Sequence, residues 1–166
     1  MSPRLVIVGA PGAGKTSVGG LVAAGLGVEF RDTDADIEQM AGKSISEIFL
    51  DDGEPVFRDL ERTAVAVALG DHEGVLALGG GAVGDEGTRE LLREQQVVFL
   101  DVGLADAAAR VGLNRDRPLL LDSPRAQLKR LLDERRPLYE QVAVFTVNTT
   151  GRSVEEVAED VMNRVR

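Results

Sequence analysis

A glycine-rich segment near the start of the chain carries the clearest chemistry in the sequence. Gly9-Ala-Pro-Gly-Ala-Gly-Lys15-Thr16 matches the Walker A pattern. Its glycines let the main chain curl so that N–H groups converge on phosphate oxygens, and the N-terminus of a following helix adds partial positive charge. We therefore predict a nucleotide site in which Lys15 reaches the β- and γ-phosphates and the Thr16 hydroxyl binds Mg²⁺.

Several residues of this segment are expected to contact ATP, namely Gly12, Ala13, Gly14, Lys15, Thr16 and Ser17. A phosphate loop does not by itself identify a reaction, because GTPases, motor ATPases and small-molecule kinases share it. A GTPase should carry Asn-Lys-x-Asp, whereas the nearest segment here is Asn114-Arg115-Asp116-Arg117. Motor ATPases usually need a larger domain, so a small-molecule kinase remains.

Two aspartates, Asp32 and Asp34, follow the second apolar run of the sequence. Alternate residues of an extended segment point the same way, so both carboxylates can face one cleft. One of them would then face Mg²⁺, and the other would deprotonate or orient an acceptor hydroxyl. The alternative is that these aspartates cap the helix that follows them.

Arg58 and a run of three glycines are candidates for the acceptor side of the site. Arg58 lies early in a helix that follows Pro55, where its guanidinium can hold a carboxylate and Glu61 can orient it. Gly79–Gly81 ends an apolar run, so a ligand can approach the main chain there. The alternatives are a solvated helix face for Arg58 and a flexible turn for the glycines.

Short apolar runs alternate with segments of helical spacing along the whole chain. The predicted strands are Leu5–Val8, Val28–Asp32, Val75–Leu78, Val97–Asp101 and Val144–Val147. The predicted helices are Lys15–Leu26, Asp36–Ala41, Ser44–Leu50, Glu54–Leu69, Glu86–Arg93, Ala105–Val111, Arg125–Arg135 and Ser153–Arg166. This order predicts one α/β domain over residues 1–166, with a five-stranded parallel sheet flanked by helices on both faces. The polar segment Gly112–Pro124 is the candidate for a mobile surface loop.

Taken in order, the motifs of the chain resemble those of the shikimate kinase family, in the nucleoside-monophosphate-kinase-like group of P-loop proteins. The motifs are Walker A, Asp32-Thr33-Asp34, Phe57-Arg58 with Glu61, Gly79-Gly80-Gly81, Arg117-Pro118-Leu119-Leu120 and Arg135-Arg136-Pro137-Leu138-Tyr139. The resemblance implies a kinase with a mobile lid that transfers the γ-phosphoryl group of MgATP to the 3-hydroxyl of shikimate, in aromatic amino acid biosynthesis. One departure is Gly20, where the family often has an arginine.

The resemblance also implies roles for individual residues, with the acceptor bound by a region of about residues 32–61. The catalytic residues would be Lys15, Asp34 and Arg117, the last reaching the transferring phosphoryl group from the lid. Mg²⁺ would be held by Thr16 and, through water, by Asp32. ATP would also be contacted by Arg117, at the phosphates, and by Arg110 and Arg152, on the adenine side. Shikimate would be bound by Asp34, Phe49, Phe57, Arg58, Gly79, Gly80, Gly81 and Arg135.

Two further features are decided by the resemblance. Phe99-Leu100-Asp101 is similar to the end of a Walker B strand, but the family pattern assigns the metal-side carboxylate to Asp32. Arg135 and Arg136 lie at a predicted helix end, where adjacent residues point about 100° apart. The spacing to Tyr139 selects Arg135 as the shikimate ligand, and Arg136 is then expected to face solvent or the helix C-terminus.

Composition limits the remaining classes of function. A net charge of −9 repels nucleic acid phosphates, so we expect no nucleic acid partner. Cysteine is absent and no apolar run approaches the roughly 18 residues of a membrane span, so we expect a cytoplasmic protein. The resemblance implies ATP and shikimate as partners, and we expect a monomer. The only histidine, His72, is interpreted as a surface turn residue. Two alternatives stay open: another kinase of this fold, such as a gluconate kinase, and a non-catalytic nucleotide-binding regulator.

Overall fold

Five short parallel strands form the centre of the structure, a computed structural model that describes residues 2–111 and 124–165. The strands are β1 (Leu5–Val8), β2 (Phe30–Asp32), β3 (Val75–Ala77), β4 (Val97–Asp101) and β5 (Phe145–Asn148). They lie in the order β2-β3-β1-β4-β5, and every pairing is parallel. The predicted α/β class with a five-stranded parallel sheet is confirmed.

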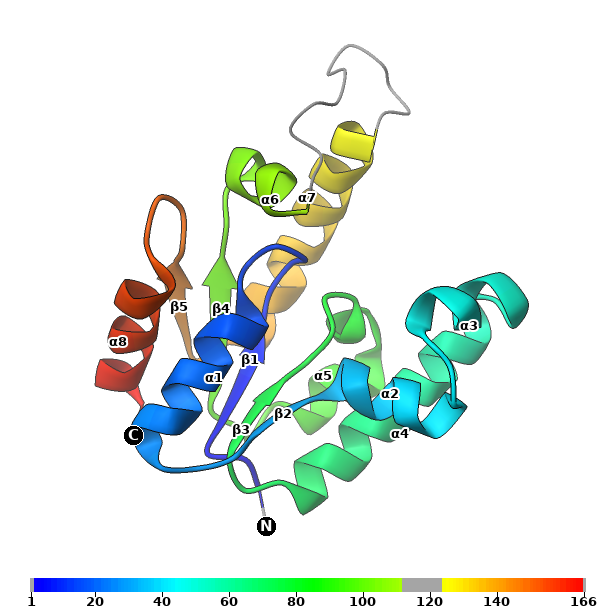
Figure 1. Cartoon of the computed structure of the whole chain (residues 1–166), viewed down its shortest axis with the longest axis horizontal. Helices are drawn as coiled ribbons and strands as arrows, with labels where there is room; N and C mark the ends of the chain where they lie inside the picture. Colours follow the sequence, from blue (N-terminus) through cyan, green and yellow to red (C-terminus); the bar gives the residue numbers. More distant parts are fainter. Residues whose placement is uncertain (1, 112–123, 166) are drawn as a thin grey trace.

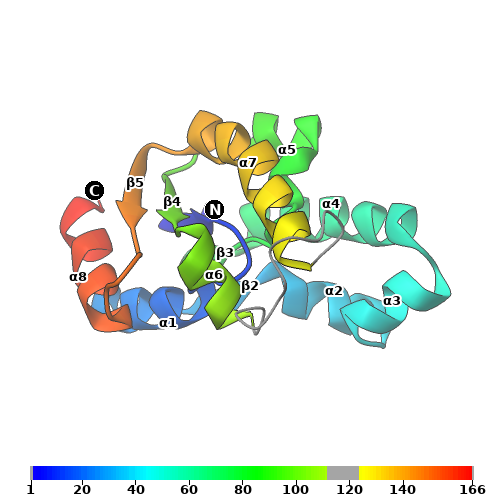
Figure 2. The same cartoon turned by 90° about the horizontal axis from the view of Figure 1, so that it is seen from above.

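Helices cover both faces of this sheet. They are α1 (Lys15–Leu26), α2 (Thr33–Ala41), α3 (Ile45–Asp51), α4 (Glu54–Asp71), α5 (Glu86–Leu91), α6 (Leu104–Arg110), α7 (Pro124–Val142) and α8 (Val154–Arg164), with a 3₁₀ turn at Ala82–Gly84. α1 and α8 pack together on one face, and α4, α5 and α7 lie on the other (Figure 1, Figure 2). α2 and α3 extend beyond β2 and pack against α4 (Figure 1).

The central strands β1, β3 and β4 are buried on both faces, which is why the sequence shows continuous apolar runs there, whereas the edge strands β2 and β5 are partly exposed. All four residues of the central strand β1 are at most 1% exposed. A second, smaller cluster holds α2, α3 and α4 together and consists of Ile37, Ile48, Phe57 and Ala64. The predicted acceptor region therefore has a small core of its own beside the main sheet.

Two adjacent glycines lie inside α1. A Cβ on Gly19 would overlap the ring of Phe30 and approach Ile7 to 3.2 Å, so this glycine lets α1 pack closely on the sheet. Among the described residues, no atom lies within 4 Å of a Cβ built on Gly20, and nothing in the structure explains that glycine.

Helix α7 is longer than the sequence pattern predicts. The predicted end at Arg135 is wrong, because α7 continues through Pro137 to Val142. An interior proline removes a helical hydrogen bond and costs roughly 3 kcal/mol. Burial of Tyr139 and Val142 against the main core offsets that cost. The other element boundaries differ from the predicted ones by at most three residues.

The predicted lid, Gly112–Pro124, lies outside the described residues except for Pro124, and Arg117 lies outside them too.

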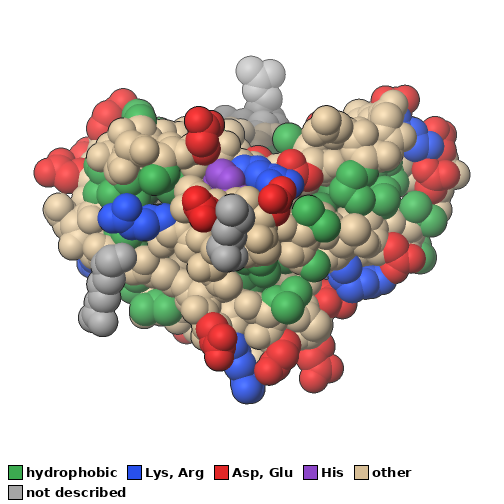
Figure 3. All heavy atoms as spheres, turned by 90° about the horizontal axis from the view of Figure 1, so that it is seen from below, with side chains coloured by type: hydrophobic (Ala, Val, Ile, Leu, Met, Phe, Trp, Pro, Cys, Tyr) green, Lys and Arg blue, Asp and Glu red, His purple; other side chains and the backbone are tan. Residues whose placement is uncertain are grey.

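Within residues 2–111 and 124–165, no helix has the length and apolar character needed to cross a bilayer. The surface at the amino ends of the strands carries intermixed acidic and basic side chains with small apolar areas between them (Figure 3). His72 ends α4, with Nε2 3.0 Å from the carbonyl oxygen of Val75, which agrees with its interpretation as a turn residue.

Candidate active site

The glycine-rich segment lies at the carboxyl ends of the strands, between β1 and α1 (Figure 1). Gly12 and Gly14 have φ angles of 84° and 88°, which residues with a Cβ adopt only at a cost. A Cβ on Gly12 would also lie 3.0 Å from the carbonyl oxygen of Ala107, so the segment packs tightly on α6. Because α1 begins directly afterwards, its unpaired N–H groups and its dipole point into this loop. This geometry suits a bound phosphate.

Lys15 folds over the phosphate loop. Its Nζ donates to the carbonyl oxygens of Gly9, at 2.7 Å, and Ala10, at 3.0 Å. Burial lowers the pKa of Lys15 to about 8, and the nearby Asp34 and Asp32 oppose that shift. The ammonium group therefore remains charged at neutral pH, and it lies where a phosphate chain on the loop would need a cation.

Thr16 and Asp32 bring two oxygen ligands together beside the loop. Thr16 Oγ1 donates to Asp32 Oδ2 at 3.2 Å, while Asp32 Oδ1 accepts from the backbone N–H of Asp34 at 2.9 Å. Asp32 is thus the N-cap of α2, as the capping alternative proposed, and it faces the phosphate loop as well. A hydroxyl and a carboxylate suit Mg²⁺, which takes its other ligands from water and phosphates. The donor set therefore fits the metal, although the described residues contain no cluster of three acidic or histidine side chains.

The geometric premise that paired Asp32 with Asp34 is wrong. β2 ends at Asp32 and α2 begins at Thr33, so Asp34 lies in the first turn of a helix and not on an extended segment. The capping interaction nevertheless brings both carboxylates to one cavity of about 250 Å³. Its lining is Gly12, Gly14, Lys15, Thr16, Ser17, Asp32, Asp34 and Leu78.

Asp34 also faces the run of glycines that follows β3. A Cβ on Gly79 would lie 2.6 Å from Asp34 Oδ1 and 3.2 Å from Glu61 Oε2, so the missing side chain is what admits both carboxylates. Burial, with repulsion from Asp32 and Glu61, raises the pKa of Asp34 to about 6. A carboxyl group with that pKa can exchange a proton near neutral pH.

Arg58 and Arg135 converge on Gly81 from two different helices. A Cβ on Gly81 would lie 2.6 Å from Arg58 Nη1 and 2.9 Å from Arg135 Nη2. Arg58 Nη1 also lies 2.7 Å from Oε1 of Glu61, whose side chain is almost fully buried, as the i,i+3 spacing indicated. Two adjacent guanidinium groups suit an anionic ligand such as a carboxylate.

Arg136 makes an ion pair that the sequence did not predict. Its Nη1 lies 2.7 Å from Asp101 Oδ2, and its guanidinium carbon is 5.9 Å from the ring centre of Phe99. Its side chain is 43% exposed, so it partly faces solvent as expected, whereas the expected helix C-terminus is not there because α7 continues to Val142. The Walker B-like aspartate, Asp101, is therefore engaged by an arginine.

Tyr139 holds the glycine run in place, a role that was not recognised in the sequence. Its hydroxyl donates to the carbonyl oxygen of Gly80 at 2.6 Å, and its ring stacks on Phe99 with centroids 5.0 Å apart. Tyr139 is 1% exposed and lies one helical turn beyond Arg135. That i,i+4 spacing inside α7 was the available signal, but it was hidden by the helix end predicted before Pro137.

Phe49 and Phe57, the predicted aromatic walls, lie next to Arg58. Their ring centroids are 4.7 Å apart, and the guanidinium carbon of Arg58 is 5.1 Å from the ring centre of Phe57. Phe57 is buried in the small core of α2–α4, whereas Phe49 is 39% exposed. Phe49 is thus the ring of this pair with more surface left for a ligand.

A second cavity, of about 470 Å³, lies beside the phosphate loop. It is lined by Gly12, Ala13, Gly14, Ser17, Val18, Arg110, Thr149, Arg152, Ser153, Val154 and Val157. Arg110 Nη1 donates to the carbonyl oxygen of Gly12 at 2.8 Å, and Nη2 donates to that of Thr149 at 3.2 Å. Arg110 and Arg152, the predicted adenine-side arginines, therefore share one cavity next to the phosphate loop, as a nucleoside site requires.

Comparisons with known proteins agree with one another. A family model described as shikimate kinase matches residues 11–166. A shikimate kinase of Saccharopolyspora erythraea is 57% identical over 166 residues, which cover 99% of this chain and 95% of the relative. A shikimate kinase of Salinispora tropica is 60% identical over 161 residues, which cover 97% of this chain and 96% of the relative.

Comparison with solved structures also finds a similar shikimate kinase. Shikimate kinase from Acinetobacter baumannii in complex with shikimate has a TM-score of 0.87 at 33% identity, covering 100% of this chain and 96% of that chain. A gluconokinase from Sinorhizobium meliloti has a TM-score of 0.56 at 22% identity, covering 96% and 89% of the two chains. At that identity the second similarity concerns the fold alone.

Proposed function

Because this chain belongs to the shikimate kinase family, we propose how its residues carry out the ATP-dependent phosphorylation of a hydroxyl group of shikimate. The acceptor is proposed to be the 3-hydroxyl group, in aromatic amino acid biosynthesis. The observation that supports these roles is the arrangement around Gly79–Gly81, with Asp34 at one end and Arg58 and Arg135 at the other. A carboxylate for a hydroxyl and two cations for a carboxylate match a hydroxy acid.

The proposed reaction is an in-line phosphoryl transfer. Asp34 orients the acceptor hydroxyl and takes its proton as that oxygen bonds to the γ-phosphorus, while the bond to the bridging oxygen breaks and ADP leaves with the electron pair. Lys15 neutralises charge on the β- and γ-phosphates, and Arg117 is proposed to add a second cation. Mg²⁺, when held by Thr16 and through water by Asp32, would supply further charge neutralisation.

We propose that the enzyme works in the cytoplasm as a monomer. ATP, its co-substrate, is an intracellular metabolite, and the absence of cysteine suits a reducing compartment. All of the proposed site residues belong to one chain, so no second copy is needed to complete the site.

The function is tested with purified protein, MgATP and a set of acceptors, following ADP release. Shikimate should support turnover, whereas gluconate and AMP should not. Faster turnover with gluconate would replace the proposed acceptor by that of the related kinase. Nucleotide binding without turnover on any hydroxy acid would instead identify a non-catalytic regulator.

Arg135→Ala is expected to lower kcat/KM for shikimate roughly 10²- to 10³-fold, mainly by raising KM, because a buried carboxylate would lose one of its cations. Binding of ATP should change little, since Arg135 lies at Gly81 and not at the nucleotide cavity. Steady-state kinetics with each substrate varied in turn will measure both effects.

Arg136→Ala is the matched control, because it removes an adjacent arginine of the same helix. It breaks a partly exposed pair with Asp101, in which the two side chains are 43% and 26% exposed, so a loss of less than about tenfold in kcat/KM is expected. A severe Arg136→Ala defect beside a mild Arg135→Ala defect would mean that the acceptor arginine has been assigned to the wrong position.

A further inference from the structure

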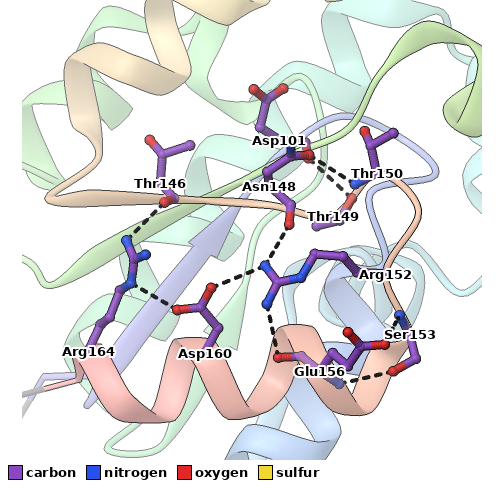
Figure 4. A network of polar contacts seen from close by, with 10 residues as sticks. All are labelled: Asp101, Thr146, Asn148, Thr149, Thr150, Arg152, Ser153, Glu156, Asp160 and Arg164. Atoms are coloured by element: carbon purple, nitrogen blue, oxygen red, sulfur yellow. Dashed lines mark hydrogen bonds and ion pairs between the residues drawn. The ribbon is translucent and has the colours of Figure 1, made fainter.

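An acidic side chain of the last helix binds two arginines, one of which, Arg152, lines the cavity proposed for the nucleoside. Asp160 on α8 lies with Oδ2 3.1 Å from Arg152 Nη1 and with Oδ1 2.9 Å from Arg164 Nε (Figure 4). Its side chain is 23% exposed. Each oxygen of this carboxylate therefore binds one arginine, and each arginine also contacts a different part of the chain.

Arg152 makes three polar contacts within the protein through its two terminal nitrogens. Besides Asp160, it donates from Nη1 to the carbonyl oxygen of Asn148 at 2.9 Å and from Nη2 to that of Glu156 at 3.4 Å (Figure 4). These partners lie on both sides of Arg152 along the chain. Arg152 consequently contributes to the cavity as a fixed part of its wall, and it is not a mobile cation waiting for a phosphate.

The other arginine joins the same carboxylate to the sheet. Arg164 Nη1 donates to the carbonyl oxygen of Thr146 on β5 at 3.3 Å. Asp160 thus connects β5, the segment between β5 and α8, and the last turn of α8 (Figure 4). Isolated exposed ion pairs contribute little, but linked pairs that share one carboxylate act as a network.

The segment between β5 and α8 is tied down at its other end as well. Thr149 accepts from Arg110 and donates through its backbone N–H to the carbonyl oxygen of Asp101 at 2.8 Å. Ser153 forms a capping box with Glu156 at the start of α8. These contacts hold the backbone of the segment. Asp160 adds a carboxylate to the guanidinium group of Arg152, beside the two carbonyl oxygens that this group also binds.

We propose that Asp160 is a positioning residue for the base of the nucleotide. It acts through Arg152, holding the segment of residues 149–153 in the shape that lines the cavity beside the phosphate loop. A wall that is ordered before the ligand arrives spares the ligand the entropic cost of ordering it. The inference rests on the proposed nucleotide site and adds a residue that touches neither ATP nor shikimate.

The test compares Asp160→Asn with Glu90→Gln in the full chain. Glu90 forms an exposed helix ion pair with Arg93 that lies away from both cavities, so its replacement is the matched loss of charge. Asp160→Asn should raise the Kd for ATP roughly five- to tenfold, with kcat at saturating ATP and KM for shikimate unchanged. Glu90→Gln should leave all three constants unchanged.

Inorganic tripolyphosphate separates positioning of the base from a general loss of structure, because it occupies a phosphate loop but carries no base. Its Kd should be the same for wild type and Asp160→Asn. Equal weakening of ATP and tripolyphosphate, or an unchanged Kd for ATP, would overturn the proposal. Arg164→Gln, which removes only the link to β5, should weaken ATP less than Asp160→Asn does, and it remains informative if the first variant folds poorly. Wild type that fails to phosphorylate shikimate would disprove the proposed function and not this inference.

Discussion

Replacement of Lys15 by alanine is expected to lower kcat by about three orders of magnitude, the typical effect of removing a preorganised charge from a transition state. Lys15 reaches across its own loop to the carbonyl oxygens of Gly9 and Ala10, and these bonds hold its ammonium group over the loop. Negative charge builds on the transferring group beside it, and no other lysine of the chain lies in this cavity. A coupled ADP-release assay at saturating ATP and shikimate measures the loss.

The control for this variant is Lys129→Ala. Lys129 lies on α7 in an exposed ion pair with Asp133, so its removal should change kcat by less than about twofold. Circular dichroism should show both variants folded. Near-normal turnover by Lys15→Ala would contradict the assignment of the phosphate loop.

The fold was largely predictable because the signals for a buried parallel sheet are local. Each central strand is a short apolar run, and β1 and β4 have the predicted bounds. The strand order was not predictable in the same way, since it depends on which runs pair across long stretches of chain. The extension of α7 beyond Pro137 was missed for a related reason. A local rule ends a helix near proline, but burial of Tyr139 and its bond to Gly80 lie outside any local window.

The candidate site shows the same difference between local contacts, which the sequence predicts, and long-range contacts, which it does not. The phosphate loop and the pair of Arg58 and Glu61 could be inferred from spacing alone, because the contacting residues are neighbours in sequence. The ion pair of Arg136 with Asp101 joins residues 35 positions apart, and no local sequence pattern predicts it. Asp32 and Asp34 line one cavity, as expected from the sequence, but the geometric argument that paired them was incorrect. A helix cap brings them to one cavity. The side chain of Asp32 accepts hydrogen bonds both from Thr16 and from the backbone N–H of Asp34, in the first turn of α2.

Asp34 is expected to combine a cost in stability with a gain in activity. Its pKa is raised to about 6 mainly because burial disfavours the ionised form. Between its ordinary pKa and about pH 6 the folded protein binds more protons than the unfolded chain, so stability falls as pH rises through this window. Above pH 6 the penalty is fully present, and below the ordinary pKa it is absent.

Asp34→Asn removes this ionisation and the proposed base together. In metal-free buffer at pH 8 the variant should be more stable than wild type by on the order of 1–2 kcal/mol, and at pH 4 the difference should vanish. Its kcat should fall by about 10²- to 10⁴-fold, while the Kd for ATP changes little, because the group acts on the acceptor. Denaturant unfolding at the two pH values and steady-state kinetics measure these effects.

Asp36→Asn provides the comparison from the same helix. Asp36 pairs with Arg31 at 2.8 Å and is absent from both cavities beside the phosphate loop, so its loss should slightly destabilise the protein at pH 8 and leave kcat nearly unchanged. The two aspartates, two positions apart on α2, should therefore shift stability in opposite directions. If Asp34→Asn instead raises the Kd for ATP strongly and keeps a near-normal kcat at saturating ATP, Asp34 is the metal-side carboxylate and Asp32 faces the acceptor, because loss of a group that acts on the metal and the phosphates weakens nucleotide binding.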